Sequence, residues 1–304
     1  MNAPLDFDSL IARGWDEHAA QPAAVAARLA DEAPALVDDE SRLIALARLA
    51  HHVHGEHLAQ WAQGVAFQQR LAMLPAHRAD GESGAALRRH IAALNLAGGL
   101  DETGDAAAMS PSDRVRISAL AAASLVMHDT PRSMALFTQA MADFDSAALP
   151  DTDPAVRALA VTGNNLAAEL EERPQRSADE SALMLLAAQA GRRFWGLTGG
   201  WLETERAEYR LSNSWRVHGD AAMARHHAAA CLAIVAAHGN APLELFFGHE
   251  ALALAEAASG DADAARAAAA RARLAFDALS ADDQTWCRAT LDRLPGGGET
   301  EAPH

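Results

Sequence analysis

Apolar residues recur every three or four positions along almost the whole chain, a spacing that predicts amphipathic α-helices rather than strands. Gly, Pro and short polar clusters interrupt this pattern and divide the chain into fourteen predicted helices. The helices are expected at 5–17, 20–37, 40–54, 57–73, 83–97, 111–128, 131–147, 153–171, 177–196, 200–218, 220–238, 242–259, 261–278 and 281–293. The longest stretch without a helical period, 98–112, is predicted to be a loop.

Three of the interruptions place Gly directly before an acidic residue, at 53–56, 217–220 and 258–261. Gly ends a helix readily because it enters the left-handed conformation without a Cβ clash. The acidic side chain can then accept hydrogen bonds from the free amides of the next helix. Each segment is therefore predicted to be a tight reversal between two antiparallel helices.

The composition strengthens the all-helical prediction. Half of the residues are hydrophobic but only 5% are aromatic, and Ala is by far the commonest residue. Ala is the best helix former and a poor strand former. Small side chains also allow helix backbones to approach closely. We therefore expect an all-α protein with closely packed helices.

Residues 200–278 resemble tetratricopeptide repeats, whose pattern is Trp-x2-Leu-Gly-x2-Tyr followed by Ala-x3-Phe. One unit reads Glu208-x2-Leu211-Ser212-x2-Trp215 and then Ala224-x3-Ala228, and the next reads His249-x2-Leu252-Ala253-x2-Glu256 and then Ala265-x3-Ala269. The Leu, the small residue beside it and the Ala of the second helix match in both units. The resemblance implies an α-solenoid of helical hairpins, a TPR-like right-handed superhelix over residues 1–294. Helix 281–293 would cap it, and 295–304 would form a flexible tail.

The same resemblance implies a function, because the first helix of each tetratricopeptide unit lines a concave groove that binds peptides. Helix 200–218 carries a polar stripe next to its apolar one, and helix 153–171 carries polar residues that suit a neighbouring wall. Amide and guanidinium groups can bond to a peptide backbone or carboxylate, and Tyr adds contact area. The peptide-binding residues predicted in this way are Glu205, Tyr209, Asn213, Arg216, Arg157, Asn164 and Asn165.

Histidines open a second possibility, a metal-binding or small-molecule sensor built on the same helices. His227 and Cys231 share a helix face near His218, and both residue types bind zinc. Packing of Cys231 as a small apolar residue in a repeat is the simpler interpretation. The segment His51-His52-Val53-His54-Gly55-Glu56-His57 could bind Zn or Ni adventitiously, but helix-end histidines that favour the negative helix terminus explain it more simply. We therefore predict no metal site.

Charge and cysteine content argue against several classes of partner and against a disulfide-bonded fold. All 25 basic residues are Arg, the net charge is −16, and such a chain repels nucleic acid and anionic membranes at long range. Two cysteines without paired spacing form no disulfide framework, and the N-terminal segment lacks a signal-peptide pattern. Together these features predict a cytoplasmic, non-catalytic protein that binds a protein or peptide segment without a cofactor. Self-association through the Ala-rich helix 261–278 is a further possibility.

Overall fold

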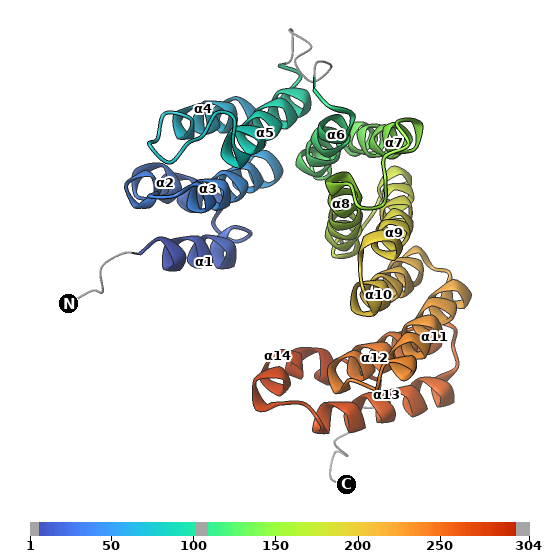
Figure 1. The fold of residues 1–304 in the computed structure, drawn as a ribbon. Coiled ribbons are helices and arrows are strands. Elements are labelled where there is room, and N and C mark those ends of the chain that lie inside the picture. The colour runs from blue at the N-terminus through green and yellow to red at the C-terminus, as the bar shows by residue number, and fades with distance from the viewer. Residues whose placement is uncertain (1–5, 101–108, 296–304) are drawn as a thin grey trace, which may run out of the picture. The chain divides into compact units, whose positions relative to one another are not determined.

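The computed structural model describes residues 6–100 and 109–295. Within these ranges the protein is all-α, with fourteen α-helices and no strand (Figure 1). The helices are α1 (Phe7–Glu17), α2 (Pro22–Asp31), α3 (Glu40–His52), α4 (Trp61–Leu71), α5 (Glu82–Gly98), α6 (Pro111–Leu125), α7 (Thr130–Ser146), α8 (Pro154–Glu171), α9 (Ala178–Thr198), α10 (Trp201–His218), α11 (Ala221–Ala237), α12 (Pro242–Ala258), α13 (Ala262–Asp277) and α14 (Ala281–Asp292). The all-α prediction is confirmed.

Two short helical segments depart from the predicted pattern. The predicted helix 20–37 is divided into α2 and a 3₁₀ turn, η1 (Ala33–Leu36). Pro34 explains this division, because Pro cannot donate the hydrogen bond that would continue the α-helix. A π-helical segment, η2 (Val53–His57), follows α3 without a break. The predicted tail 295–304 and loop 98–112 lie largely outside the described residues.

The chain divides into two compact units, Met1–Leu159 and Ala160–His304, and the division falls within α8. In the first unit, α5 contacts α3, α4 and α6, while α6 packs along α7. One of its core clusters joins side chains of α1 to α5, including Phe7, Leu43, Leu46 and Phe67. In the second unit each helix from α9 to α14 packs on the next, and α10 also contacts α12.

Small residues bring helices close together in the second unit, as the composition predicts. A Cβ atom added to Gly163 of α8 would lie 2.6 Å from the carbonyl oxygen of Ala187 in α9. The same added atom would lie 2.8 Å from the amide nitrogen of Gly191. Contacts this short leave no room for a side chain, so the packing of α8 on α9 requires Gly at position 163.

Two of the three predicted reversals are confirmed. Gly219 and Gly260 adopt left-handed conformations, with φ of +99° and +83°. The acidic residue after each Gly then caps the next helix. Asp220 accepts a hydrogen bond from the amide of Met223, and Asp261 accepts one from the amide of Ala264. The segment 215–227 is therefore a hinge in a helical hairpin.

The predicted reversal at 53–56 is wrong. Gly55 continues a helical path inside η2, and the next helix begins only at Trp61. Close tertiary packing explains the difference, because a Cβ atom on Gly55 would lie 2.7 Å from Ser124 Oγ on α6. Gly55 therefore serves close approach between elements and does not end a helix.

The histidines of this segment were interpreted as helix-end residues, and two of them are buried. His51 is only 2% exposed and His54 is buried as well. Burial lowers the pKa of His51 to about 4, so its ring stays neutral near pH 7. These two rings belong to the core of the first unit.

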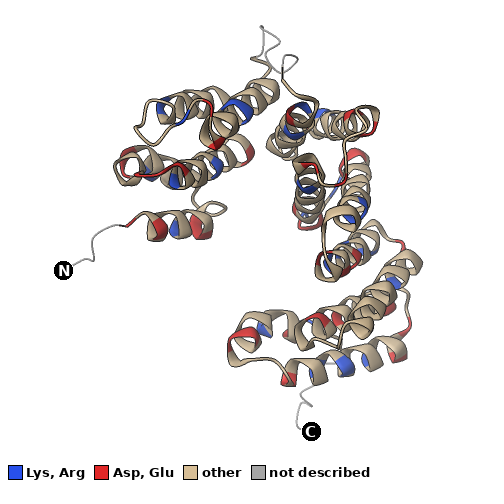
Figure 2. Cartoon of the chain, in the orientation of Figure 1, with Lys and Arg blue, Asp and Glu red and all other residues tan. Residues whose placement is uncertain are grey.

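Acidic and basic residues are both spread over the helices of the two units (Figure 2). No described helix is both long enough and apolar enough to cross a membrane.

Candidate functional site

The second unit contains a cavity of about 430 Å³. Its lining residues come from four helices: Asn164 from α8, Glu205, Arg206, Tyr209 and Arg210 from α10, Leu243, Glu244 and Phe247 from α12, and Trp286 from α14. This volume lies within the range of ordinary small-ligand sites, about 300–1,000 Å³.

Two buried carboxyl groups, Glu205 and Glu244, form the acidic part of this cavity. Glu244 pairs with Arg206, with Nη2 and Oε1 3.1 Å apart. Glu205 is 1% exposed, and its Oε1 accepts a hydrogen bond from Cys231 Sγ at 2.7 Å. Among the described residues, no basic side chain forms an ion pair with Glu205.

Burial is the main influence on the Glu205 carboxyl, and it raises the pKa to about 7. The Cys231 hydrogen bond opposes this rise in pKa, and the nearby charge of Glu244 adds to it. Glu205 therefore changes charge near neutral pH, where an ordinary Glu side chain stays ionised.

Aromatic side chains form the other part of the cavity lining. Phe247 has its ring centroid 5.5 Å from that of Trp286 and 5.6 Å from that of Tyr209, in edge-to-face arrangements. Trp286 is 66% exposed, which is unusual for so large an apolar side chain. Carboxylates and aromatic faces thus meet in one cavity.

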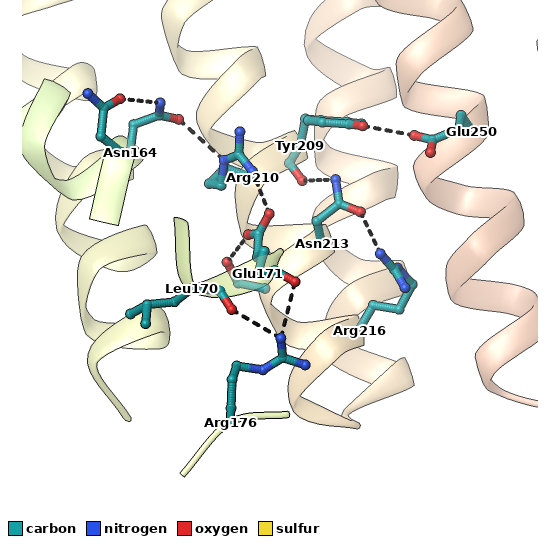
Figure 3. A network of polar contacts seen from close by, with 11 residues as sticks. Asn164, Leu170, Glu171, Arg176, Tyr209, Arg210, Asn213, Arg216 and Glu250 are labelled. Atoms are coloured by element: carbon teal, nitrogen blue, oxygen red, sulfur yellow. Dashed lines mark hydrogen bonds and ion pairs between the residues drawn. The ribbon is translucent and has the colours of Figure 1, made fainter. Parts of the chain in front are cut away.

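A polar network fixes the orientation of Tyr209 and its neighbours (Figure 3). The Tyr209 hydroxyl donates a hydrogen bond across to Glu250 Oε2 on α12, at 3.0 Å. Glu250 is buried, and burial raises its pKa above the ordinary value. Burial and the Glu250 charge also raise the pKa of Tyr209. Tyr209 therefore remains a protonated donor that links α10 to α12.

Arg210 makes the corresponding link between α10 and α8 (Figure 3). Its Nη1 forms an ion pair with Glu171, and its Nε donates to Asn164 Oδ1 at 3.4 Å. Ser214 Oγ also donates to Glu171. Although Glu171 stands near a helix end, its side chain is largely buried, and burial raises its pKa. These bonds hold α8 against one edge of the cavity.

Three of the seven predicted peptide-binding residues line this cavity: Glu205, Tyr209 and Asn164. Asn165 is exposed beside it and accepts a hydrogen bond from Asn164 Nδ2 at 3.2 Å. Arg157 is exposed and belongs to the part of α8 in the first unit.

The remaining two predicted residues, Asn213 and Arg216, form hydrogen bonds within α10. Asn213 is buried, and its Nδ2 donates to the carbonyl oxygen of Tyr209 at 3.4 Å. Arg216 Nη2 donates to Asn213 Oδ1 at 3.2 Å (Figure 3). Both residues support the helix surface behind Tyr209 and do not line the cavity.

Sequence reasoning missed the other cavity residues, which are Arg206, Arg210, Leu243, Glu244, Phe247 and Trp286. One signal was present, because Arg206 and Arg210 stand four residues apart, directly beside the stripe of Glu205 and Tyr209. Trp286 was assigned only to a capping helix, and nothing in its local sequence indicates that it is exposed beside Phe247.

The histidines and cysteine around 218–231 do not converge on one another. Cys231 is buried against Glu205, as its packing interpretation predicts. His227 Nδ1 lies 2.7 Å from Glu208 Oε2, and Glu208 also pairs with Arg192. His218 is exposed. Cys231 is therefore a packing residue, and His227 is a hydrogen-bond partner of Glu208.

Comparisons with protein-family models, with curated proteins and with solved structures find no match to this chain.

Proposed function

We propose that the protein is a non-catalytic binding protein whose cavity in the second unit receives a basic side chain of a peptide or protein segment. The observation that supports this proposal is the meeting of two buried carboxyl groups, Glu205 and Glu244, with the aromatic side chains of Phe247 and Trp286.

A guanidinium or ammonium group suits both parts of this lining. It can form a charge-assisted hydrogen bond with the Glu205 carboxylate, which lacks a cationic partner among the described residues. It can also lie against the Phe247 and Trp286 rings, since cations are attracted to aromatic faces. A cation held here would favour the ionised form of Glu205. Because the pKa of this group is about 7, its ionisation near neutral pH requires little free energy.

The arrangement of helices supports a TPR-like solenoid as the scaffold for this site. The hairpins α10–α11 and α12–α13 both turn through a Gly–Asp pair, and α10 also packs on α12. In tetratricopeptide repeats the first helices of successive units adjoin in this way and line the ligand groove. The cavity lies on α10 and α12, in the position that the resemblance would give to a peptide.

The non-catalytic part of the proposal is supported by the chemistry beside Glu205. Burial and the adjacent Glu205 carboxylate raise the pKa of the Cys231 thiol. The thiol therefore stays protonated and supplies no thiolate nucleophile. The net charge of −16 also favours encounter with a basic partner, and this attraction weakens as salt is added.

Fluorescence polarisation with four labelled peptide pools tests the proposal. The pools share degenerate Ala/Ser/Gly flanks and differ in a fixed central Arg, Lys, Gln or Glu. We expect the Arg or Lys pool to bind at least about tenfold more tightly than the Gln pool, which corresponds to about 1.4 kcal/mol. The double variant Glu205→Gln/Glu244→Gln should lose this preference.

The matched control is Glu172→Gln, which removes an exposed carboxylate outside the cavity. It should keep the preference for the basic pools. Equal binding of all four pools, or an unchanged preference in the double variant, would refute the proposal.

A further inference from the structure

Three imidazole rings from separate elements meet in the first unit. His18 follows α1, His52 is the last residue of α3, and His57 is the last residue of η2. One possible ligand atom from each residue lies within 4.8 Å of the other two. All three side chains are partly exposed, so ions in solution can reach them.

The π-helical segment creates this convergence. His52 and His57 are five residues apart, and in an α-helix that spacing would point their side chains about 140° apart. In η2, the amide of Leu58 donates to the carbonyl of Val53 at 3.1 Å, which is the i→i+5 hydrogen bond of a π-turn. The wider turn returns His57 to the side of His52, with their Nε2 atoms 3.1 Å apart. Such π-turns are frequent at functional sites.

Two of the three rings are already oriented as metal ligands usually are. His18 Nδ1 donates to the carbonyl oxygen of Trp15. His52 Nδ1 donates to Glu56 Oε2 at 2.9 Å. Metal-binding histidines typically donate their second ring N–H to a backbone carbonyl or a carboxylate in this way. Both bonds use the Nδ1 proton and leave Nε2 with a free lone pair.

The contact between His52 and His57 fits a shared ion. Because Nδ1 of His52 carries the proton, its Nε2 can only accept. A second Nε2 at 3.1 Å is then favourable if it carries a proton or if both lone pairs point at a cation. Two nitrogen ligands of tetrahedral zinc, each about 2.0–2.1 Å from the metal, lie ~3.3 Å apart. The observed separation is close to that value.

We propose that His18, His52 and His57 form a tri-histidine site for a divalent transition-metal ion, with Zn²⁺ as the best-suited ion. Imidazole nitrogen is a good ligand for zinc, and three such ligands leave a fourth position for water or another small ligand. Glu56 is a positioning residue that acts through His52. The Trp15 ring forms one wall, with its centroid 5.1 Å from that of His52.

This site is independent of the cavity proposed for basic side chains, because all of its residues lie in the first unit. It does not require the peptide-binding proposal to hold.

Isothermal titration of Zn²⁺ into the untagged full chain, after dialysis against a chelator, tests the site. We expect one saturable zinc ion per chain. His18→Ala and His57→Ala should each weaken zinc binding at least about tenfold. Glu56→Ala should weaken it by about 10–100-fold while keeping the stoichiometry, as expected for a residue that orients a ligand.

The matched control is His226→Ala, which removes an exposed histidine of the second unit and should leave zinc affinity unchanged. Circular dichroism of each variant checks helix content. His18 lies beyond the end of α1, so its replacement should preserve the fold even if His57→Ala does not.

A second measurement does not depend on comparing affinities. Zn²⁺ should raise the midpoint of thermal unfolding of the natural protein, because it binds the folded state, and at the same zinc concentration should raise that of His18→Ala less. No saturable zinc binding to the natural protein would overturn the proposal. Equal affinity in folded His18→Ala, or an equal loss in His226→Ala, would also overturn it.

Discussion

Replacement of Glu205 by Gln should make the protein more stable above neutral pH. The substitution keeps the shape of the side chain and keeps an oxygen that can accept the Cys231 hydrogen bond. It removes the need to bury a negative charge at a position that is 1% exposed. The expected gain therefore measures the cost of that buried charge.

The size of the gain follows from the pKa of Glu205, which burial raises from 4.5 to about 7. Between these two values the folded protein binds more protons than the unfolded chain, so its stability falls as the pH rises. Above the pKa that Glu205 has in the folded protein, this loss of stability is complete. At about 1.36 kcal/mol per pKa unit, it amounts to about 3 kcal/mol. The Gln variant does not undergo this loss.

Urea unfolding followed by circular dichroism at pH 5 and pH 8.5 measures the difference. At pH 8.5 we expect Glu205→Gln to exceed the natural protein by about 3 kcal/mol in free energy of unfolding. At pH 5 the advantage should be smaller by about 2 kcal/mol, since little of the loss has yet occurred. Glu172→Gln, at an exposed position, should show no such change with pH. A Glu205→Gln advantage that is absent at pH 8.5, or equal at both pH values, would refute the buried-charge argument.

Three further substitutions test the packing and the turns by the same unfolding measurement. Gly163→Ala should cost about 1–3 kcal/mol because the new Cβ would overlap the backbone of α9 at 2.6 Å, and no loss would contradict that contact. Asp220→Ala should cost about 1 kcal/mol through loss of the α11 cap, whereas the exposed Asp282→Ala, which caps no helix, should cost less. Tyr209→Phe should cost about 1–3 kcal/mol because it leaves the buried Glu250 without its donor, and an unchanged stability would show that the bond is dispensable.

The features predicted well from sequence are those that local chemistry decides. Apolar spacing located the helices, and the Gly–Asp pairs at 219–220 and 260–261 encode their turns because left-handed Gly and a capping carboxylate act within a few residues. The Gly–acid pattern gave a wrong prediction at Gly55, because there close contact with Ser124 of a helix distant in sequence decides the backbone path.

The candidate sites were less predictable because tertiary packing creates them. The polar stripe of helix 200–218 predicted Glu205 as a binding residue, but its burial and its hydrogen bond from Cys231 of the next helix were not predictable from that spacing. Likewise, the histidine-rich segment 51–57 was visible in the sequence, but His18 was not linked to it. Thirty-odd residues separate His18 from His52, and no local spacing rule connects them.

The π-turn at Val53–His57 amounts to one residue more than an α-helix needs to cover the same rise. Loss of a single residue between His52 and His57 would let the helix wind regularly and would leave the two histidines four residues apart, on one face and about 40° from each other. A single residue gained between two such histidines of an ordinary helix is absorbed in the same way when a π-turn forms around it. The pairing of these two rings therefore tolerates a single insertion or deletion in this segment.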